Sequence, residues 1–342
     1  MEGKGKPSIE EIAALCNVSK ATVSRVINQN PKGVGKETRK RVLDVIEKLN
    51  YRPNALARGI ATARSGIIGL VVPDLSNFFY PKIVRGITDT MDRHQGSVLV
   101  ANSDYDPEKE ARQLLQMVDK RVDGIILCSG VSNAAFLSDF RKYHIPVALI
   151  GRSYDISLCD ISISGNNVKG GYQAAKYLLD NGSRRIAFVE GKFHTSGGTQ
   201  RLEGFHQAHQ EAGIPVDSSL LMEGDYTIAF GRKAARLLVH QKKKIDAVMT
   251  GSDLIAIGLV TEFQALGLRV PEDVEIIGYD NIELSAVFHP MLSTVSKPHY
   301  DMAVFITEQL LKLAAGEKVQ LPHMKVEPEL VLRETTRKKV SP

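Results

Sequence analysis

From Ile67 onward the chain alternates short apolar runs with longer amphipathic stretches, and this alternation restricts the folds open to it. The strand-like runs are "IIGLVV", "SVLVAN", "DGIILC", "PVALIG", "RIAFVE", "DAVMTG" and "VEIIGY". The stretches between them have helical spacing and include "EARQLLQMVDK", "GYQAAKYLLDNG", "FGRKAARLLVHQ" and "LIAIGLVTEFQALG". Strands that alternate with helices form parallel sheets, because crossover connections are right-handed. The pattern therefore predicts a doubly wound α/β fold.

These runs are too many for one modest sheet, so we expect two similar lobes. The first lobe is expected to contain residues 65–164 and 295–323, and the second residues 165–294 and 324–337. In this division "STVSKP" returns the chain to the first lobe, and one strand near "MKVEPELVLRE" completes the second. Several crossings between two lobes create a cleft that can close around a ligand.

The charge of the chain is concentrated in its first fifth. Residues 1–64 carry 13 Lys and Arg against 6 Asp and Glu, a net charge of +7, whereas the other 278 residues carry a net charge of −2. Most charged segments are simply solvated surface. A basic segment joined to a nearly neutral body is also typical of a nucleic-acid-binding module.

The basic segment begins with signals for two short helices. Ser8, followed three residues later by Glu11, fits a capping box that starts a helix. This helix is expected to end near Cys16-Asn17, since Asn tolerates a left-handed conformation. Ser19 then caps a second helix. Two short helices joined by a tight turn form a helix-turn-helix.

A third helix over residues 36–50 is expected to close a small core, which makes residues 1–50 an all-α domain. Its apolar positions are Val42, Leu43, Val45, Ile46 and Leu49. The segment that follows, residues 51–64, is a linker in which Asn54 can cap another short helix. Gly59 and the shortage of apolar side chains make that helix marginal. We expect it to form where something supports it.

The exposed face of the second helix suits the major groove of DNA, which admits one helix. The polar and small residues on this face are Ser19, Lys20, Ala21, Thr22, Ser24, Arg25 and Asn28. Arg25 can bind guanine with two hydrogen bonds, and Lys20 can reach a base edge or a phosphate. The short hydroxyl and amide side chains are suited to phosphate oxygens. The alternative is an ordinary polar helix face.

The segments "IEEIAALCNVSKATVSRVIN", "TRKRV", "LNYRPNALARG", "IIGLVVPDLSNFFY", "KRVDGIIL", "RLEGF" and "VEIIGYDN" occur in an order and spacing that resembles the lactose-repressor (LacI/GalR) family of bacterial transcription regulators. The resemblance covers essentially the whole chain. It implies a two-lobed core like that of periplasmic binding proteins behind an N-terminal helix-turn-helix. It also implies that Lys20, Ala21 and Arg25 read bases. The further DNA contacts that it implies are Tyr51, Asn54, Ala57 and, as a minor-groove wedge, Ile60.

Ligands of open α/β sheets bind beyond the carboxyl ends of the strands. The candidate ligand-binding residues at these ends are Asn77, Phe79, Tyr80, Arg152, Arg201, Tyr226, Ser252, Asp280 and Lys297. The aromatic rings can stack on a sugar. The resemblance implies that Arg201 and Asp280 contact the effector. For each residue taken singly, the alternative is a structural cap or a loop contact.

The charges of these residues favour an anionic effector. Arg152, Arg201 and Lys297 are opposed by Asp280 and Asp253 alone, and an excess of buried positive charge is best satisfied by an acid or a phosphate. If Arg152 instead points outward or pairs with Asp155, a neutral sugar such as ribose fits equally well.

The sequence lacks the common motifs of nucleotide-binding proteins, hydrolases, metalloproteases and membrane proteins. There is no GxGxxG after a strand, no GxxxxGK[ST], no GxSxG, no HExxH, and no apolar run long enough to cross a membrane. Cys16, Cys128 and Cys159 have neither disulfide nor zinc spacing. We therefore expect no enzyme, cofactor or metal site.

The expectation is a cytoplasmic, homodimeric repressor of a carbohydrate-utilisation operon. It would bind a pseudo-palindromic double-stranded DNA operator under the control of a sugar, sugar acid or sugar phosphate. The alternatives are a sugar-binding protein without a regulatory role, and a regulator that activates or needs a co-repressor.

Overall fold

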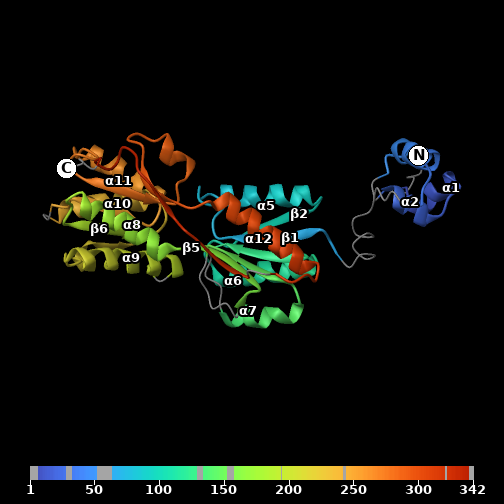
Figure 1. Cartoon of the computed structure of the whole chain (residues 1–342), viewed down its shortest axis with the longest axis horizontal. Helices are drawn as coiled ribbons and strands as arrows, with labels where there is room; N and C mark the ends of the chain where they lie inside the picture. The colour runs from blue at the N-terminus through green and yellow to red at the C-terminus, as the bar shows by residue number, and fades with distance from the viewer. Residues whose placement is uncertain are drawn as a thin grey trace. The chain divides into compact units, whose positions relative to one another are not determined.

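The computed structural model describes residues 7–27, 33–51, 64–128, 134–151, 158–193, 195–241, 244–319 and 322–338. The chain forms two compact units, residues 1–65 and residues 66–342. Figure 1 shows an all-helical N-terminal unit and an α/β unit that contains two sheets.

The N-terminal unit contains helices α1 (Ile9–Leu15), α2 (Lys20–Ile27) and α3 (Lys36–Lys48). The Oγ of Ser8 accepts a hydrogen bond from the backbone N–H of Glu11 at 3.1 Å, which caps α1. Asn17 has a positive φ of 49°, so it turns the chain after α1 as predicted. The Oγ of Ser19 accepts from the N–H of Thr22 at 3.1 Å and caps α2. The predicted helix-turn-helix is confirmed.

The core of this unit is small. Its buried side chains are Ile12, Ala13, Cys16, Val23, Val26 and Val42. The prediction that Leu43 belongs to this core is wrong, since 48 % of the residue is exposed. Successive residues of a helix are rotated by about 100°. Leu43 therefore points away from the face that Val42, Ile46 and Leu49 turn toward the other helices.

The first sheet of the α/β unit contains strands β1 (Ile67–Val72), β2 (Ser97–Asn102), β3 (Gly124–Cys128), β4 (Val147–Ile150), β5 (Ile161–Gly165) and β11 (His323–Val326). The strand order is β11-β5-β4-β3-β1-β2, and all neighbours are parallel. Its helices are α5 (Pro81–Arg93), α6 (Pro107–Asp119), α7 (Ala134–Phe140) and α12 (His299–Ala314). Helices α5 and α12 cover one face, and α6 and α7 cover the other (Figure 1).

The second sheet repeats this plan with β6 (Ile186–Glu190), β7 (Leu221–Glu223), β8 (Ala247–Thr250), β9 (Glu275–Tyr279), β10 (Ser293–Ser296) and β12 (Glu329–Val331). The order is β12-β10-β9-β8-β6-β7, parallel except where β12 pairs with β10. Helices α8 (Asn167–Asp180) and α9 (Ser196–Ala212) pack on one face, and α10 (Ile228–His240) and α11 (Asp253–Ala265) on the other. Short 3₁₀ helices lie at Arg141–Tyr143, Ser218–Leu220 and Glu283–Ala286. The predicted doubly wound fold is confirmed.

The chain passes between the two sheets three times, after β5, after β10, and between β11 and β12. The expected lobe boundaries at 294/295 and 323/324 differ from this strand pairing. Residues 293–296 belong to the second sheet, since Val295 pairs with Tyr279. The run expected to be one strand is two, one in each sheet. Pro328 separates them, because proline lacks the N–H that a strand ladder needs.

Candidate functional site

A cavity of about 360 Å³ lies at the carboxyl ends of strands from both sheets, within the range of roughly 300–1,000 Å³ that small-molecule sites occupy. Of the candidate ligand-binding residues, those that line this cleft are Asn77, Phe79, Tyr80, Arg201, Tyr226, Ser252, Asp280 and Lys297. The loop after β1 supplies the first three, and the second sheet and its helices supply most of the rest. Arg152 lies outside the described residues.

Arg201 is held by a carboxylate that the sequence analysis missed. Its Nε lies 2.8 Å from Oε2 of Glu190 and its Nη2 lies 3.0 Å from Oε1, so the two side chains form a bidentate pair. Glu190 ends β6 and is fully buried, and Arg201 on α9 is also buried. Burial disfavours the guanidinium charge, but the attraction and hydrogen bonds of Glu190, together with smaller contributions from Tyr226 and Tyr279, outweigh burial and raise the pKa of Arg201. The same Nη2 donates to the hydroxyl of Tyr226 at 3.3 Å.

This pair corrects the expected surplus of positive charge. Arg201 was expected to be opposed by Asp280 and Asp253 alone, but Glu190 neutralises it directly. A signal was present, since a charged residue closes the otherwise apolar run "RIAFVE". What the sequence could not show is that α9 brings Arg201 back onto the end of β6.

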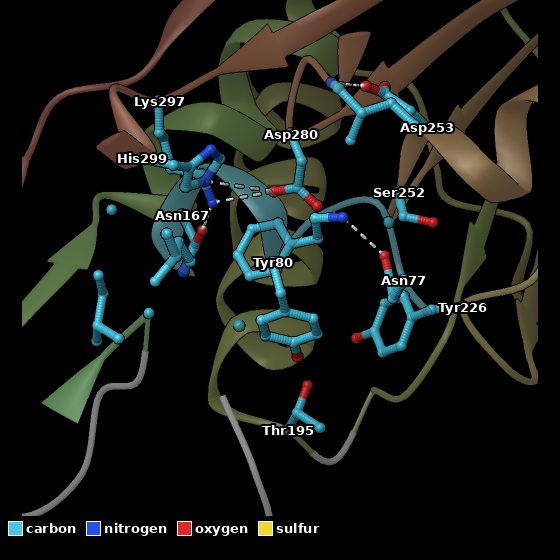
Figure 2. Close-up of a pocket in the computed structure, with 18 of the residues that line it drawn as sticks. Asn77, Tyr80, Asn167, Thr195, Tyr226, Ser252, Asp253, Asp280, Lys297 and His299 are labelled. Carbon is cyan, nitrogen blue, oxygen red and sulfur yellow. Dashed lines mark hydrogen bonds and ion pairs between the residues drawn. The ribbon is translucent and has the colours of Figure 1, made fainter. Parts of the chain in front are cut away.

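A second ion pair joins Asp280 and Lys297. The Nζ of Lys297 lies 3.3 Å from Oδ1 of Asp280, and their side chains are 8 % and 12 % exposed respectively. Figure 2 shows Lys297 and His299 directed at this carboxylate. Burial raises the pKa of Asp280 and lowers the pKa of Lys297, and the attraction between them opposes both shifts. The pair is the acceptor and donor that the predicted site requires.

The backbone that presents Asp280 is strained and is held by Asp253. Asp280 has a φ of 97° and Asn281 a φ of 49°, in a region that side-chain-bearing residues rarely adopt. The buried carboxylate of Asp253 accepts from the N–H of Ile282 at 2.8 Å and from Oγ1 of Thr294 at 2.6 Å. A side chain at Gly278 would lie 2.1 Å from Asp253, so this packing requires glycine there. Asp253 therefore positions the loop that carries Asp280.

Tyr279 forms a further part of the site that sequence reasoning missed. The centre of its buried ring lies 4.8 Å from Cζ of Arg201 and 4.7 Å from Nζ of Lys297. Its hydroxyl donates to Oδ1 of Asn167, another lining residue that was missed, at 3.1 Å. The ring therefore contacts a cation of each ion pair and contributes cation–π attraction to both.

His299, at the start of α12, also lines the cleft and was missed. Its Nε2 is buried, lies 3.9 Å from Oδ1 of Asp280, and has no hydrogen-bond partner among the described residues. Burial, and then the charge of Lys297, lower the pKa of His299 well below its usual value, so the ring is neutral. Phe79 packs edge-on against it at 4.8 Å. A buried polar atom without a partner calls for an explanation, and a ligand group in the cavity that His299 lines would supply the missing hydrogen bond.

The candidate nucleic-acid face lies in the N-terminal unit. Most of the candidate contacts on and beside α2 are accessible, as contact with DNA requires. The exposed residues are Ser19, Lys20, Ala21 and Arg25, and the half-buried ones are Thr22 and Ser24. The Nζ of Lys20 pairs with Oε1 of Glu10 on α1 at 2.6 Å.

Not every candidate DNA contact lies on that surface. Tyr51 packs partly against the three-helix core, and its N–H donates to the carbonyl of Ile46 at 2.9 Å. The candidates that lie outside the described residues are Asn28, Asn54, Ala57 and Ile60.

Known proteins share both units. Residues 65–324 match the family "Periplasmic binding proteins and sugar binding domain of LacI family", and residues 8–54 match "Bacterial regulatory proteins, lacI family". Catabolite control protein A of Priestia megaterium is 38 % identical over 92 % of this chain and 96 % of its own length.

Solved structures agree. The lac repressor dimer bound to operator and the anti-inducer ONPF superposes with a TM-score of 0.86 at 25 % identity, over 97 % of this chain and 99 % of that one. The complex of the transcriptional regulator CelR with cellobiose gives a TM-score of 0.73 at 29 % identity, over 96 % and 99 %.

The chain belongs to the LacI family of bacterial regulatory proteins. It is a DNA-binding transcriptional regulator, and the relatives named above are regulators and not enzymes. Within the described part of the chain, no group of three or more His, Cys, Asp or Glu side chains could hold a metal ion. No helix there is both long and apolar enough to cross a membrane.

Proposed function

We propose that the protein is a cytoplasmic repressor of a carbohydrate-utilisation operon and that a sugar or sugar derivative in the cleft controls its binding to the operator. The observation that carries this proposal is the Asp280–Lys297 pair, which presents an acceptor and a donor 3.3 Å apart inside a cavity that Phe79 and Tyr226 also line. Adjacent sugar hydroxyls both donate and accept, and aromatic rings cover the apolar face of a sugar ring. The lac repressor and the CelR–cellobiose complex support the same assignment.

The DNA contacts follow from the α2 surface. In the proposed dimer, two copies of α2 enter successive major grooves of a pseudo-palindrome. Lys20, Ala21 and Arg25 would read base edges, while Ser19, Thr22, Ser24 and Asn28 would bind phosphates. The segment after α3 would supply Tyr51, Asn54 and Ala57 to the backbone and Ile60 as a wedge in the minor groove.

The effector would act through closure of the two halves of the α/β unit. Both sheets line the cleft, so a ligand that contacts both favours the closed form. Closure would change the geometry of the dimer and the support for the linker helices. A coupling free energy of about 1–3 kcal/mol is enough to alter operator occupancy several-fold.

The test begins with the full chain. Selection from random double-stranded DNA yields an operator, and fluorescence anisotropy then measures its affinity in the presence of individual sugars. We expect a two-fold symmetric site and at least one sugar that weakens binding. A sugar that strengthens binding would make the protein a co-repressor-dependent regulator instead. Selection without any enriched sequence would contradict the proposal and favour a sugar-binding protein without a regulatory role.

A further inference from the structure

We propose that Glu190 sets the charge of the cleft, so that the protein accepts an uncharged polyhydroxyl ligand and rejects the corresponding acid or phosphate. This inference rests on the proposed function of the cleft as a sugar site and specifies the chemical class of its effector. It reverses the preference for an anion that the sequence alone suggested.

Most of the hydrogen-bonding capacity of Arg201 is already used within the protein. A free guanidinium would be the natural partner of a carboxylate or phosphate. Here two of its three nitrogens, Nε and Nη2, are bound to Glu190 at 2.8 and 3.0 Å. An anionic ligand would therefore have to displace Glu190 or approach Arg201 through Nη1 alone.

Displacement of Glu190 by an anionic ligand is unfavourable, because its carboxylate occupies a space that two glycines leave free. The backbone N–H of Gly191 donates to Oε1 at 2.9 Å. A side chain at Gly251, on the neighbouring strand end, would lie 2.1 Å from the same oxygen. The carboxylate is fully buried, so separating it from Arg201 would leave an uncompensated charge in the interior.

The charged side chains that line the cleft are balanced by partners. Of the described cations that line the cleft, Arg201 is matched by Glu190 and Lys297 by Asp280, and the lining residue His299 is neutral. The remaining ionisable carboxyl, Asp253, can add negative charge but not positive. Among the described residues that line the cleft, an entering anion would meet two carboxylates and no cation that lacks a carboxylate partner, whereas an uncharged ligand needs no compensation.

The cleft presents both donors and acceptors of hydrogen bonds. Asp280 can accept hydrogen bonds and Lys297 can donate them. The buried Nε2 of His299 has no hydrogen-bond partner among the described residues. Hydroxyl groups can serve donors and acceptors together, whereas carboxylate and phosphate oxygens only accept. The hydroxyls of Ser252 and Thr195 extend the mixed pattern along the cleft.

The experiment compares matched ligand pairs by calorimetry on the full chain: glucose with gluconate, ribose with ribose 5-phosphate, and cellobiose with cellobionate. The variants are Glu190→Gln, the double variant Glu190→Gln/Arg201→Gln, and the control Glu203→Gln. Glu203 is an exposed carboxylate two residues beyond Arg201 on the outer side of α9. Thermal unfolding of each variant shows whether it folds.

In the wild type we expect at least one neutral sugar to bind about tenfold or more tightly than its anionic counterpart. Glu190→Gln leaves Arg201 unpaired and should reduce or reverse this preference by a similar factor. The double variant restores charge balance and should lose the acquired response to anions even if its sugar affinity falls. Glu203→Gln should keep the wild-type preference.

Tighter binding of the anionic member of any pair by the wild type would overturn the inference. Binding of none of the neutral sugars, or an unchanged preference in a folded Glu190→Gln protein, would also overturn it. The proposed function fails separately, if a neutral sugar binds in calorimetry but leaves operator affinity unaltered in the anisotropy assay.

Discussion

Single residues hold the site through partners that are distant in the sequence. Candidate ligand-binding residues could be predicted because they follow apolar strands, and carboxyl ends of parallel strands meet at one edge of a sheet. Glu190 could not be assigned a role in this way, because its partner Arg201 comes from the next helix and their contact depends on packing. Asp253 was predicted to balance charge, yet its hydrogen bonds to Ile282 and Thr294 make it a support for the Asp280 loop.

Asp253 also gives the protein a pH-dependent stability. Burial raises its pKa from 3.8 to about 8, although its hydrogen bonds oppose this. The folded state therefore retains a proton that the unfolded state releases, so the contribution of Asp253 is full below pH 3.8 and is lost as the pH rises through about 8. Asp253→Asn does not titrate. The melting temperature of the wild type relative to Asp253→Asn should fall between pH 5.5 and about 8 and level off above that, as measured by scanning calorimetry. A constant difference would contradict this.

At the scale of elements, local signals predicted the N-terminal unit well and long-range pairing poorly. Ser8, Asn17 and Ser19 act on backbone groups within three residues or through their own φ angle, so the sequence contains the whole interaction. Strands β11 and β12 are different. Their run of residues has no internal sign that its two halves join different sheets, apart from the proline between them.

Helix α2 should read sequence through Arg25. Arg25→Ala should weaken operator binding by about 1–3 kcal/mol and relax the preference at one base pair in each half-site. Repeating the DNA selection with the variant measures both effects. If binding to all DNA sequences weakens equally, Arg25 contacts a phosphate instead.

The ion pair between α1 and α2 should oppose DNA binding. Glu10 holds Lys20 at 2.6 Å on the surface expected to face DNA, where its charge also repels phosphates. Glu10→Gln should therefore tighten binding a few-fold at low salt, and the gain should shrink as salt screens the charges. Anisotropy titrations across salt concentrations test this. In a Lys20→Gln background the effect of Glu10→Gln should be smaller, and an equal effect would show that the pair is not involved.

On the scale of the whole molecule, the proposed mode of regulation requires two copies. One α2 helix reads one half-site, and a two-fold symmetric operator needs a two-fold symmetric protein. Light scattering on the full chain at micromolar concentration should therefore give a mass corresponding to two chains of 37.6 kDa. A mass of one chain, or of four, would contradict this expectation.

Because the chain passes between the two sheets three times, the protein becomes able to respond to an effector only late in its synthesis. Strands β11 and β12 are the last to leave the ribosome, and each forms an edge of a different sheet. The first half of the α/β unit is not complete before residue 326 has emerged and the second not before residue 331, whereas the N-terminal helices are finished after residue 48. A nonsense codon even at position 322 would thus damage both halves at once and leave the helix-turn-helix intact. Such truncations should separate the capacity to contact DNA from the capacity to sense a metabolite.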